Sequence, residues 1–226
     1  MQPANFDRIA RPYRWLEYLT FGPMLERCRF YRIPQLAFAR RALVLGDGDG
    51  RFLARLLAAN PHLHADVIDQ SPAMLRMLES RAAAIGSRAC VHSHRGDALA
   101  FQPTGTYDLV ITHFFLDCLS TEEVQALASR IRPHLAPNAI WVVSEFAIPS
   151  GPAALPARII VDALYTAFRV ITGLRARVLP DYGAALAREG FTLADRRPFL
   201  RGLIVSDLWW PQPAVAAQPS ATLNEE

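Results

Sequence analysis

Acidic side chains follow two short apolar runs of this 226-residue chain, where they could bind a nucleotide. The runs, 42–45 and 65–68, are of the kind that forms fully buried strands. Asp47 lies in a glycine-rich turn after the first run, and Asp69 follows the second. Asp69 comes 23 residues after Gly46, close to the offset of about 20 residues at which an acidic side chain meets a ribose in nucleotide-binding sheets. Because a carboxylate accepts hydrogen bonds from both ribose hydroxyls, the spacing predicts that Asp69 binds a ribose.

The glycine turn indicates which nucleotide. Gly46, Gly48 and Gly50 lack a Cβ, so the backbone can bend and approach a ligand closely. The dinucleotide fingerprint GxGxxG needs glycine or alanine directly after Gly50, where this chain has arginine, and a P-loop needs a lysine, which the chain lacks altogether. Asp47 and Asp49 lie inside the turn, where they would repel a pyrophosphate but suit a cation. The turn therefore favours a nucleoside that carries positive charge and no phosphate.

A histidine and a further aspartate follow a later strand-like run. Residues 107–112 predict a strand that ends at His113, with Asp117 close behind. In an open α/β sheet, ligands lie beyond the carboxyl ends of the strands where the strand order reverses. His113 titrates near neutral pH and Asp117 could orient it or take a substrate proton, so both are candidate catalytic residues. The alternative for His113 is that it only packs on the ligand or donates to it.

These motifs, in this order, resemble those of the class I methyltransferases that depend on S-adenosylmethionine (SAM), nearest to the small-molecule enzymes of quinone biosynthesis. The resemblance rests on Gly46-x-Gly48-x-Gly50, Ile68-Asp69-Gln70-Ser71-Pro72-Ala73-Met74-Leu75 and Gly96-Asp97-Ala98. The family usually has an acidic residue two positions before the first glycine. This chain has Val44 there, and Asp47 could take over part of that role. The resemblance implies SAM as the cofactor and methyl transfer, by in-line displacement, to a small hydrophobic acceptor.

The resemblance also implies which residues touch the ligands. Asp97 would accept from the adenine amine, and Tyr13 would reach the cofactor from an N-terminal helix or else be a core aromatic. The full set expected to contact SAM is Tyr13, Gly46, Asp47, Gly48, Gly50, Asp69, Gln70, Met74, Gly96, Asp97, Ala98 and His113. The acceptor is expected to lie against Phe114, Phe115, Tyr165 and Phe168. No metal is expected, because the pairs His62/His64 and His92/His94 would each need a third ligand and no cluster of Cys or Glu supplies one.

Strands and helices alternate along the chain, which, with the resemblance, predicts an α/β fold: a doubly wound, seven-stranded, mostly parallel sheet with an antiparallel C-terminal strand. The expected strands are 42–45, 65–68, 89–94, 107–112, 139–148, 191–196 and 203–209, and the expected helices are 3–20, 24–31, 51–59, 72–85, 120–132, 157–174 and 181–189. Residues 1–210 are expected to form one methyltransferase domain, with an N-terminal helical cap (1–40), a variable substrate-side helix (150–178) and a disordered tail (211–226).

Helix 157–174 is apolar around most of its circumference, so it should be buried or cover something apolar. It could shape the acceptor pocket, or it could lie in the core or in a homodimer interface.

Composition narrows the classes of protein. With 51% hydrophobic and 20% charged residues the chain can bury a full core. The net charge is +3 without an arginine stripe interleaved with aromatics, so nucleic-acid binding is not indicated. Three unpatterned cysteines, no signal-like start and no uncharged apolar run of about 18 residues predict a cytoplasmic protein without disulfides or a membrane span.

Three rival functions stay open at this point. A SAM-fold enzyme could catalyse elimination or cyclisation, which the valine at position 44 permits. A non-catalytic module could bind SAM and regulate a partner through helix 157–174. An NAD-dependent reductase would instead bind a dinucleotide tightly.

Overall fold

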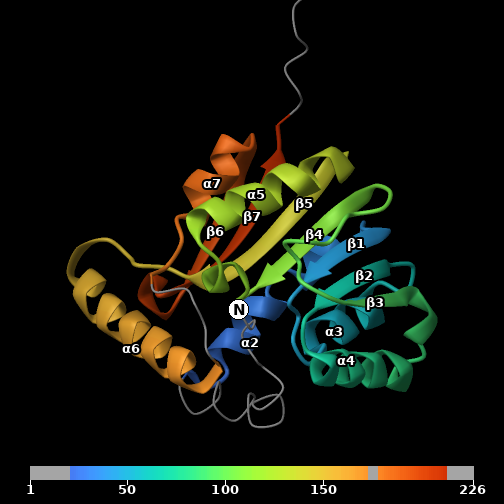
Figure 1. Cartoon of the computed structure of the whole chain (residues 1–226), viewed down its shortest axis with the longest axis horizontal. Coiled ribbons are helices and arrows are strands. Elements are labelled where there is room, and N and C mark those ends of the chain that lie inside the picture. Colours follow the sequence, from blue (N-terminus) through green and yellow to red (C-terminus); the bar gives the residue numbers. More distant parts are fainter. Residues whose placement is uncertain (1–20, 173–177, 213–226) are drawn as a thin grey trace, which may run out of the picture.

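A seven-stranded sheet forms the centre of the computed structural model, which describes residues 21–172 and 178–212 (Figure 1). The strand order is β3-β2-β1-β4-β5-β7-β6, with β1 to β5 parallel and β7 antiparallel to both of its neighbours. The strands are β1 (Arg41–Leu45), β2 (His64–Asp69), β3 (Val91–Arg95), β4 (Tyr107–His113), β5 (Leu135–Phe146), β6 (Phe191–Phe199) and β7 (Ile204–Pro211). The strand order reverses between β1 and β4, so the predicted doubly wound architecture is confirmed.

Helices cover both faces of the sheet and enclose two apolar cores. The helices are α2 (Met24–Phe30), α3 (Arg51–Ala59), α4 (Pro72–Ala84), α5 (Thr121–Ile131), α6 (Ala154–Thr172) and α7 (Tyr182–Arg188), and the 3₁₀ turns are Ile33–Leu36, Arg88–Cys90, Leu116–Cys118, Arg132–His134, Gly151–Ala153 and Leu200–Gly202. Helices α3 and α4 pack on one face, and α5 and α7 pack on the other (Figure 1). Alternate strand residues feed the two cores, which is the period of two expected of strands buried on both faces.

Side-chain caps begin three helices within one residue of their predicted starts. The Ser71 hydroxyl accepts from the amide at the third position of α4, and Asp181 does the same for α7. At α5, Ser120 and Glu123 form a reciprocal capping box, in which each side chain accepts from the other's amide. These caps satisfy amides that would otherwise lack a partner, so the sequence fixes these helix starts well.

Strand boundaries differ from the prediction by one to four residues, and the differences in three strands have a clear structural cause. The third strand begins at Val91, because Arg88–Cys90 forms a 3₁₀ turn instead. The fifth strand begins at Leu135, which pairs with Tyr107 ahead of an irregularity in the register, and ends at Phe146. The sixth strand continues to Phe199 through a proline, which is tolerated because β6 is an edge strand.

Helix α6 buries one face only. Val161 and Tyr165 are buried in a third apolar cluster, whereas Leu155 and Ile159 are 69% and 61% exposed. Figure 1 shows α6 standing apart from the helices on both faces of the sheet. Of the alternatives, burial on all sides within this chain is excluded for the described residues, whereas a role in covering an apolar ligand or a second copy stays a prediction. The helix begins at Ala154 rather than at position 157.

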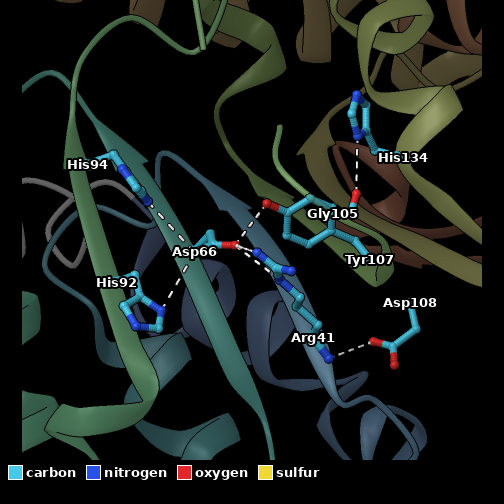
Figure 2. Close-up of polar contacts among 8 residues, drawn as sticks. All are labelled: Arg41, Asp66, His92, His94, Gly105, Tyr107, Asp108 and His134. Atoms are coloured by element: carbon cyan, nitrogen blue, oxygen red, sulfur yellow. Dashed lines mark hydrogen bonds and ion pairs between the residues drawn. The ribbon is translucent and has the colours of Figure 1, made fainter. Parts of the chain in front are cut away.

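A polar cluster centred on Asp66 links β1, β2, β3 and β4 (Figure 2). Asp66 accepts hydrogen bonds from Arg41 at 2.9 Å and from Tyr107 at 2.8 Å, and the rings of His92 and His94 each lie 3.7 Å from its other oxygen. Burial alone would raise the pKa of Asp66, but the hydrogen bonds from Arg41 and Tyr107 hold it below the ordinary value. Within the described ranges no group of three or more metal-binding side chains could hold a metal ion.

Gly50, in the turn before α3, and Gly86, after α4, have similar backbone conformations but different surroundings. Alanine substitutions at the two positions should therefore differ in their effect on stability. Gly50 has a φ of +78°, and an added Cβ would lie 2.6 Å from the backbone of Leu78 in α4. Gly86 has a φ of +74°, with nothing within 4 Å of an added Cβ. We expect Gly86→Ala to lower the free energy of unfolding by about 1–2 kcal/mol, the cost of a left-handed conformation. Gly50→Ala should lower it by about 1–3 kcal/mol more, because of overpacking.

Urea unfolding of the two variants measures this difference. Equal losses of stability would show that the contact between the turn and α4 does not constrain the fold.

Candidate functional site

The carboxyl ends of three neighbouring strands bring the predicted groups to one edge of the sheet. Leu45 pairs with Ile68 of β2 on one side and with Thr112 of β4 on the other. The residues that follow these positions, the glycine turn, Asp69 and His113, therefore emerge level with one another. This is the edge at which ligands bind in sheets of this topology.

The glycine turn is closed on one side and open on the other. A Cβ on Gly46 would lie 2.5 Å from the ring of Phe115, whereas a Cβ on Gly48 would meet nothing within 4 Å. Asp47, between them, accepts a hydrogen bond from the amide of Leu53 at 3.2 Å. Burial raises the pKa of Asp47 to about 7, although the Leu53 amide and the positive charge of Arg29 oppose that rise. The open side of the turn therefore presents a carboxyl group that a cationic ligand would ionise.

The second carboxylate of the turn is paired with cationic side chains of the chain itself. Asp49 is buried, and its two oxygens form ion pairs with Arg51 and Arg81, each at 3.0 Å. The expectation that both turn carboxylates attract a cation is wrong for Asp49. The charge of Asp49 is neutralised by Arg51 of α3 and Arg81 of α4, and these ion pairs hold the turn against both helices.

Asp69 and the turn after β3 lie side by side. One carboxylate oxygen of Asp69 accepts from the amide of Ser71 at 2.8 Å, and the Gly96 amide donates to the Asp69 carbonyl at 3.1 Å. Asp97 is exposed, and one of its oxygens accepts from the Leu99 amide within its own turn. Among the other predicted contacts in this region, Met74 and Ala98 are buried and Gln70 is exposed.

His113 is enclosed at the end of β4. Its side chain is 3% exposed, and its ring lies edge-on to Phe52 of α3, with centroids 4.3 Å apart. Both ring nitrogens lack a hydrogen-bond partner among the described residues. Burial, with the nearby charge of Arg29, holds the pKa of His113 well below its ordinary value. The ring is therefore a neutral imidazole that has one N–H to donate.

Glu145 organises the turn that carries Asp117. One oxygen of Glu145 accepts from the amides of Phe115 at 2.9 Å and Leu116 at 2.7 Å, and the other has no partner among the described residues. Burial raises the pKa of Asp117 to about 6, and burial together with the charge of Asp117 raises that of Glu145. The Tyr165 hydroxyl donates to the Asp117 carbonyl at 2.7 Å, which ties α6 to the same turn. Burial therefore holds both carboxyl groups towards their protonated forms.

The aromatic residues after β4 point to two different neighbours. Phe115 packs on the glycine turn, and Phe114 lies against Phe146 with ring centroids 5.3 Å apart. Phe114 has a φ of +52°, which is costly for an aromatic residue and is typical of functional sites. The guanidinium of Arg29 lies 4.9 Å above the Phe114 ring.

Sequence patterns did not indicate Arg29 as a site residue. It lies in α2, next to the buried Cys28, and only the topology brings α2 over the end of β4. Two predicted site contacts lie outside the described part of the chain, namely Tyr13 and the side chain of Phe168, as do the predicted helix 3–20 and the tail from position 213.

The comparisons with known proteins agree with this geometry. A family model described as a methyltransferase domain matches residues 43–141, which include the glycine turn, Asp69 and His113. The chain is 32% identical over 154 residues to the release factor glutamine methyltransferase of Cereibacter sphaeroides, a match that covers 62% of this chain and 54% of that protein. It is 29% identical over 128 residues to polyamine aminopropyltransferase 2 of Bacillus cereus, covering 52% and 34%. The chain thus spans about a third to a half of these relatives.

Solved structures with the same fold include several methyltransferases. Mitomycin 7-O-methyltransferase MmcR has a TM-score of 0.69 at 17% identity, covering 92% of this chain and 61% of that one. A putative O-methyltransferase of Nostoc punctiforme also has a TM-score of 0.69 at 17% identity, covering 87% and 59%. The SAM-dependent methyltransferase SibL has a TM-score of 0.66 at 21% identity, covering 90% and 57%. At these identities the likenesses establish the fold.

The raised pKa of Asp47 predicts how the stability of the unliganded protein changes with pH. The folded protein holds this proton up to a pH of about 7, against 3.8 for the ordinary carboxyl group. The stability that this group contributes is full below the ordinary pKa and is lost as the pH rises through about 7. Asp47→Asn stays neutral and keeps an acceptor for the Leu53 amide. The variant should therefore be more stable than the wild type at pH 8, by on the order of 2 kcal/mol, with the gap closing towards pH 4.

Urea unfolding at several pH values checks this prediction, because the other raised carboxyl groups cancel between the two proteins. Asp49→Asn should behave oppositely at pH 8, since it loses two ion pairs. A gap between Asp47→Asn and the wild type that stays constant from pH 4 to 8 would contradict the account.

Proposed function

We propose that this chain, which belongs to the class I, Rossmann-like methyltransferases that use SAM as cofactor, transfers a methyl group from SAM to a small, apolar acceptor. The observation that carries the proposal is the meeting of an open glycine turn, the ionisable Asp47 and the strand-ending Asp69 at one edge of the sheet. The narrower resemblance to the enzymes of quinone biosynthesis stays a prediction.

The described residues fit SAM. Gly48 and Gly96 leave space where a Cβ would meet nothing within 4 Å, so an adenosine can approach the backbone at both turns. Asp69 would accept from the ribose hydroxyls, and Asp97 from the adenine amine. Asp47 would bind the ammonium group in place of the family's usual acid, which this chain lacks at Val44. The remaining expected contacts, Gly46, Gly50, Gln70, Met74 and Ala98, would shape the same site.

SAM, when bound, supplies an electrophilic methyl group on a sulfonium. The chain's part is mainly to hold the acceptor in line with that group and to exclude water, which can contribute up to about 7–11 kcal/mol in favourable cases. We propose that Asp117, supported by Glu145, takes a proton from the acceptor where one must leave. The pKa of Asp117, raised by burial to about 6, suits a proton acceptor that works near neutral pH.

His113 was expected as a catalytic base or as a packing group. Its enclosure and lowered pKa favour the second role, with the imidazole N–H donating to a bound ligand. We therefore keep His113 in the site as a neutral hydrogen-bond donor rather than as the base.

An apolar acceptor suits the surroundings of Asp117. Phe114 and Tyr165 belong to the third apolar cluster, and Phe115 lines the glycine turn from the same loop. We propose these three, with Phe168, as the acceptor contacts. Mitomycin 7-O-methyltransferase, of the same fold, acts on a small molecule by its name, which is in keeping with this proposal.

One alternative has specific support. The match to an aminopropyltransferase shows that a related sequence carries the name of a different transfer reaction, so chemistry other than methylation stays an alternative. A non-catalytic SAM-binding module is the other. Transfer of label from methyl-tritiated SAM to small molecules of a cell extract supports methylation, and saturable SAM binding without any transfer favours the module.

Location and assembly are proposed on separate grounds. Across residues 21–172 and 178–212, no helix is long and apolar enough to cross a membrane. We propose a cytoplasmic location, because Cys28, Cys90 and Cys118 are all free thiols. A homodimer would use the exposed face of α6, where Leu155 and Ile159 lie, and sedimentation velocity of the purified chain tests it.

Calorimetric titration with SAM and with NAD tests the proposed cofactor, with one variant for the ribose contact. We expect SAM to bind and NAD not to. Asp69→Ala should weaken SAM by about 10–100-fold, the usual loss for a hydrogen bond to a charged group.

Asp108→Ala is the matched control. Asp108 accepts from the amides of Arg40 and Arg41, away from the candidate site, and Figure 2 shows it beside Arg41. Its loss should leave SAM affinity unchanged. Unchanged affinity in Asp69→Ala, with a melting temperature like that of the control, would refute the ribose assignment.

A further inference from the structure

We propose that Cys118 is a positioning residue for Asp117: its thiol donates a hydrogen bond to the carboxylate and so fixes the direction of the group that takes the acceptor's proton. The Sγ of Cys118 lies 3.4 Å from Oδ1 of Asp117, and a thiol is a weak hydrogen-bond donor. The inference rests on the proposed function, in which Asp117 is the base. It deepens that function by adding the residue that orients the base.

The 3₁₀ turn Leu116–Cys118, which carries both side chains, is fixed at its two ends. Its first residue is fully buried in the apolar core beneath α5 and α7, and the amide of that residue donates to Glu145 at 2.7 Å. The Cys118 amide donates to the carbonyl of the residue before the turn at 3.1 Å, and the Tyr165 hydroxyl donates to the Asp117 carbonyl at 2.7 Å. Because the backbone is held on both sides, the thiol and the carboxylate meet from fixed positions.

The thiol keeps its proton and therefore acts as the donor of the pair. Burial raises the pKa of Cys118 well above its ordinary value, and the negative charges of Asp117 and Glu145 act in the same direction. A protonated thiol has one S–H to donate, whereas an ionised carboxylate only accepts. The hydrogen bond therefore runs from Cys118 to Asp117 whenever Asp117 is ready to take a proton.

Asp66, a buried carboxylate with stronger donors, shows why a weak donor suits a base. Arg41 and Tyr107 donate to Asp66, and these hydrogen bonds outweigh burial and hold its pKa below the ordinary value (Figure 2). At the half-buried Asp117, burial outweighs the thiol, the charge of Arg29 and the amides of the turn, so the pKa is about 6. A hydrogen bond from a charged donor is about twice as strong as a neutral one. The thiol therefore orients the carboxylate without removing its basicity near neutral pH.

The other side chains that act electrostatically with Asp117 lie on three separate elements of the described structure. Glu145 of β5 is the second carboxyl group, and the charge of Asp117 helps to raise its pKa. Arg29 of α2 lowers the pKa of Asp117. Burial and both carboxylates raise the pKa of Tyr165 in α6, which therefore stays neutral. A substitution of the cysteine leaves all three in place, so a change in the pKa of Asp117 reports the loss of the thiol hydrogen bond.

Carbon-13 NMR of protein labelled at the aspartate carboxyl groups measures this pKa, and the Asp117 signal is the one missing from Asp117→Asn. Cys118→Ala should raise the pKa of Asp117 by about 0.5–1, because the lost hydrogen bond favours the ionised form. Cys118→Val, which keeps more of the volume without a donor, should do the same. Cys118→Ser keeps a donor and should hold the pKa at or below the wild-type value. Cys90→Ala, a matched change in the turn before β3, should leave it unchanged.

The pH dependence of methyl transfer gives a readout that a purely structural role would not change. A base must be ionised to accept a proton, so transfer from methyl-tritiated SAM to small molecules of a cell extract falls as the pH drops through the pKa of Asp117. In Cys118→Ala the acid limb should lie about 0.5–1 higher in pH, with the largest loss near pH 6 and little loss at pH 8. Cys118→Ser should restore the wild-type profile.

The two measurements separate failure of the inference from failure of the proposed function. A raised pKa in Cys118→Ala that serine reverses, with the acid limb moving in step, supports the inference. Equal Asp117 pKa values in the wild type, Cys118→Ala and Cys118→Ser overturn it, whatever the transfer assay shows. A raised pKa with an unmoved acid limb overturns the role of Asp117 as the base and leaves methyl transfer intact. A wild type that binds SAM and transfers no label would instead end the proposed function itself.

Discussion

The close packing of the glycine turn against its surroundings is the constraint on which the site depends. A side chain at Gly46 would strike Phe115, and one at Gly50 would strike the backbone of α4. The turn is thus clamped between the loop after β4 and the second helix, and Gly48 is left as its open position. Because the clamp joins β1, β4 and α4, it sets the positions of Asp47, Asp69 and His113 relative to one another.

Among the described residues several carboxyl groups lie at this edge, and burial opposes the ionisation of three of them. Asp47, Asp117 and Glu145 all have raised pKa values, whereas Asp49 is matched by two arginines. Arg29 is the basic residue whose charge reaches two of the raised groups. A site of this kind stabilises a ligand that brings positive charge, and it would destabilise a diphosphate. The same charge distribution favours the proposed cofactor and is consistent with the proposed role of Asp117 as a proton acceptor.

Local sequence signals predicted most of the fold. Capping residues such as Ser71 and Ser120 and apolar runs such as 42–45 specify their elements from neighbours within a few positions. The boundaries that were missed depend on distant partners. Leu135 is a strand residue because it pairs with Tyr107, and the exposed face of α6 depends on how few elements pack against it.

The candidate site likewise contains residues that local sequence spacing indicates and residues that only distant contacts bring to the site. Asp69 and the three glycines were identifiable because their spacing reflects a local strand-turn-helix unit. Asp49 was misjudged because its partner Arg81 lies a full helix away, and Arg29 was missed because only the topology brings α2 over Phe114. The sequence around Glu145 did not indicate its role. Glu145 lies in β5, and it accepts hydrogen bonds from the amides of the loop that follows β4, a different strand.

Binding of SAM to a Gly48→Ala variant tests the central claim most directly. Gly48 and Gly86 both have left-handed backbones with nothing within 4 Å of an added Cβ, so alanine at either should cost similar stability, about 1–2 kcal/mol. If the open side of the turn receives SAM, Gly48→Ala loses SAM affinity by about 100-fold or more while Gly86→Ala keeps it. Equal, wild-type affinity in two folded variants would contradict the account, because SAM would then bind elsewhere.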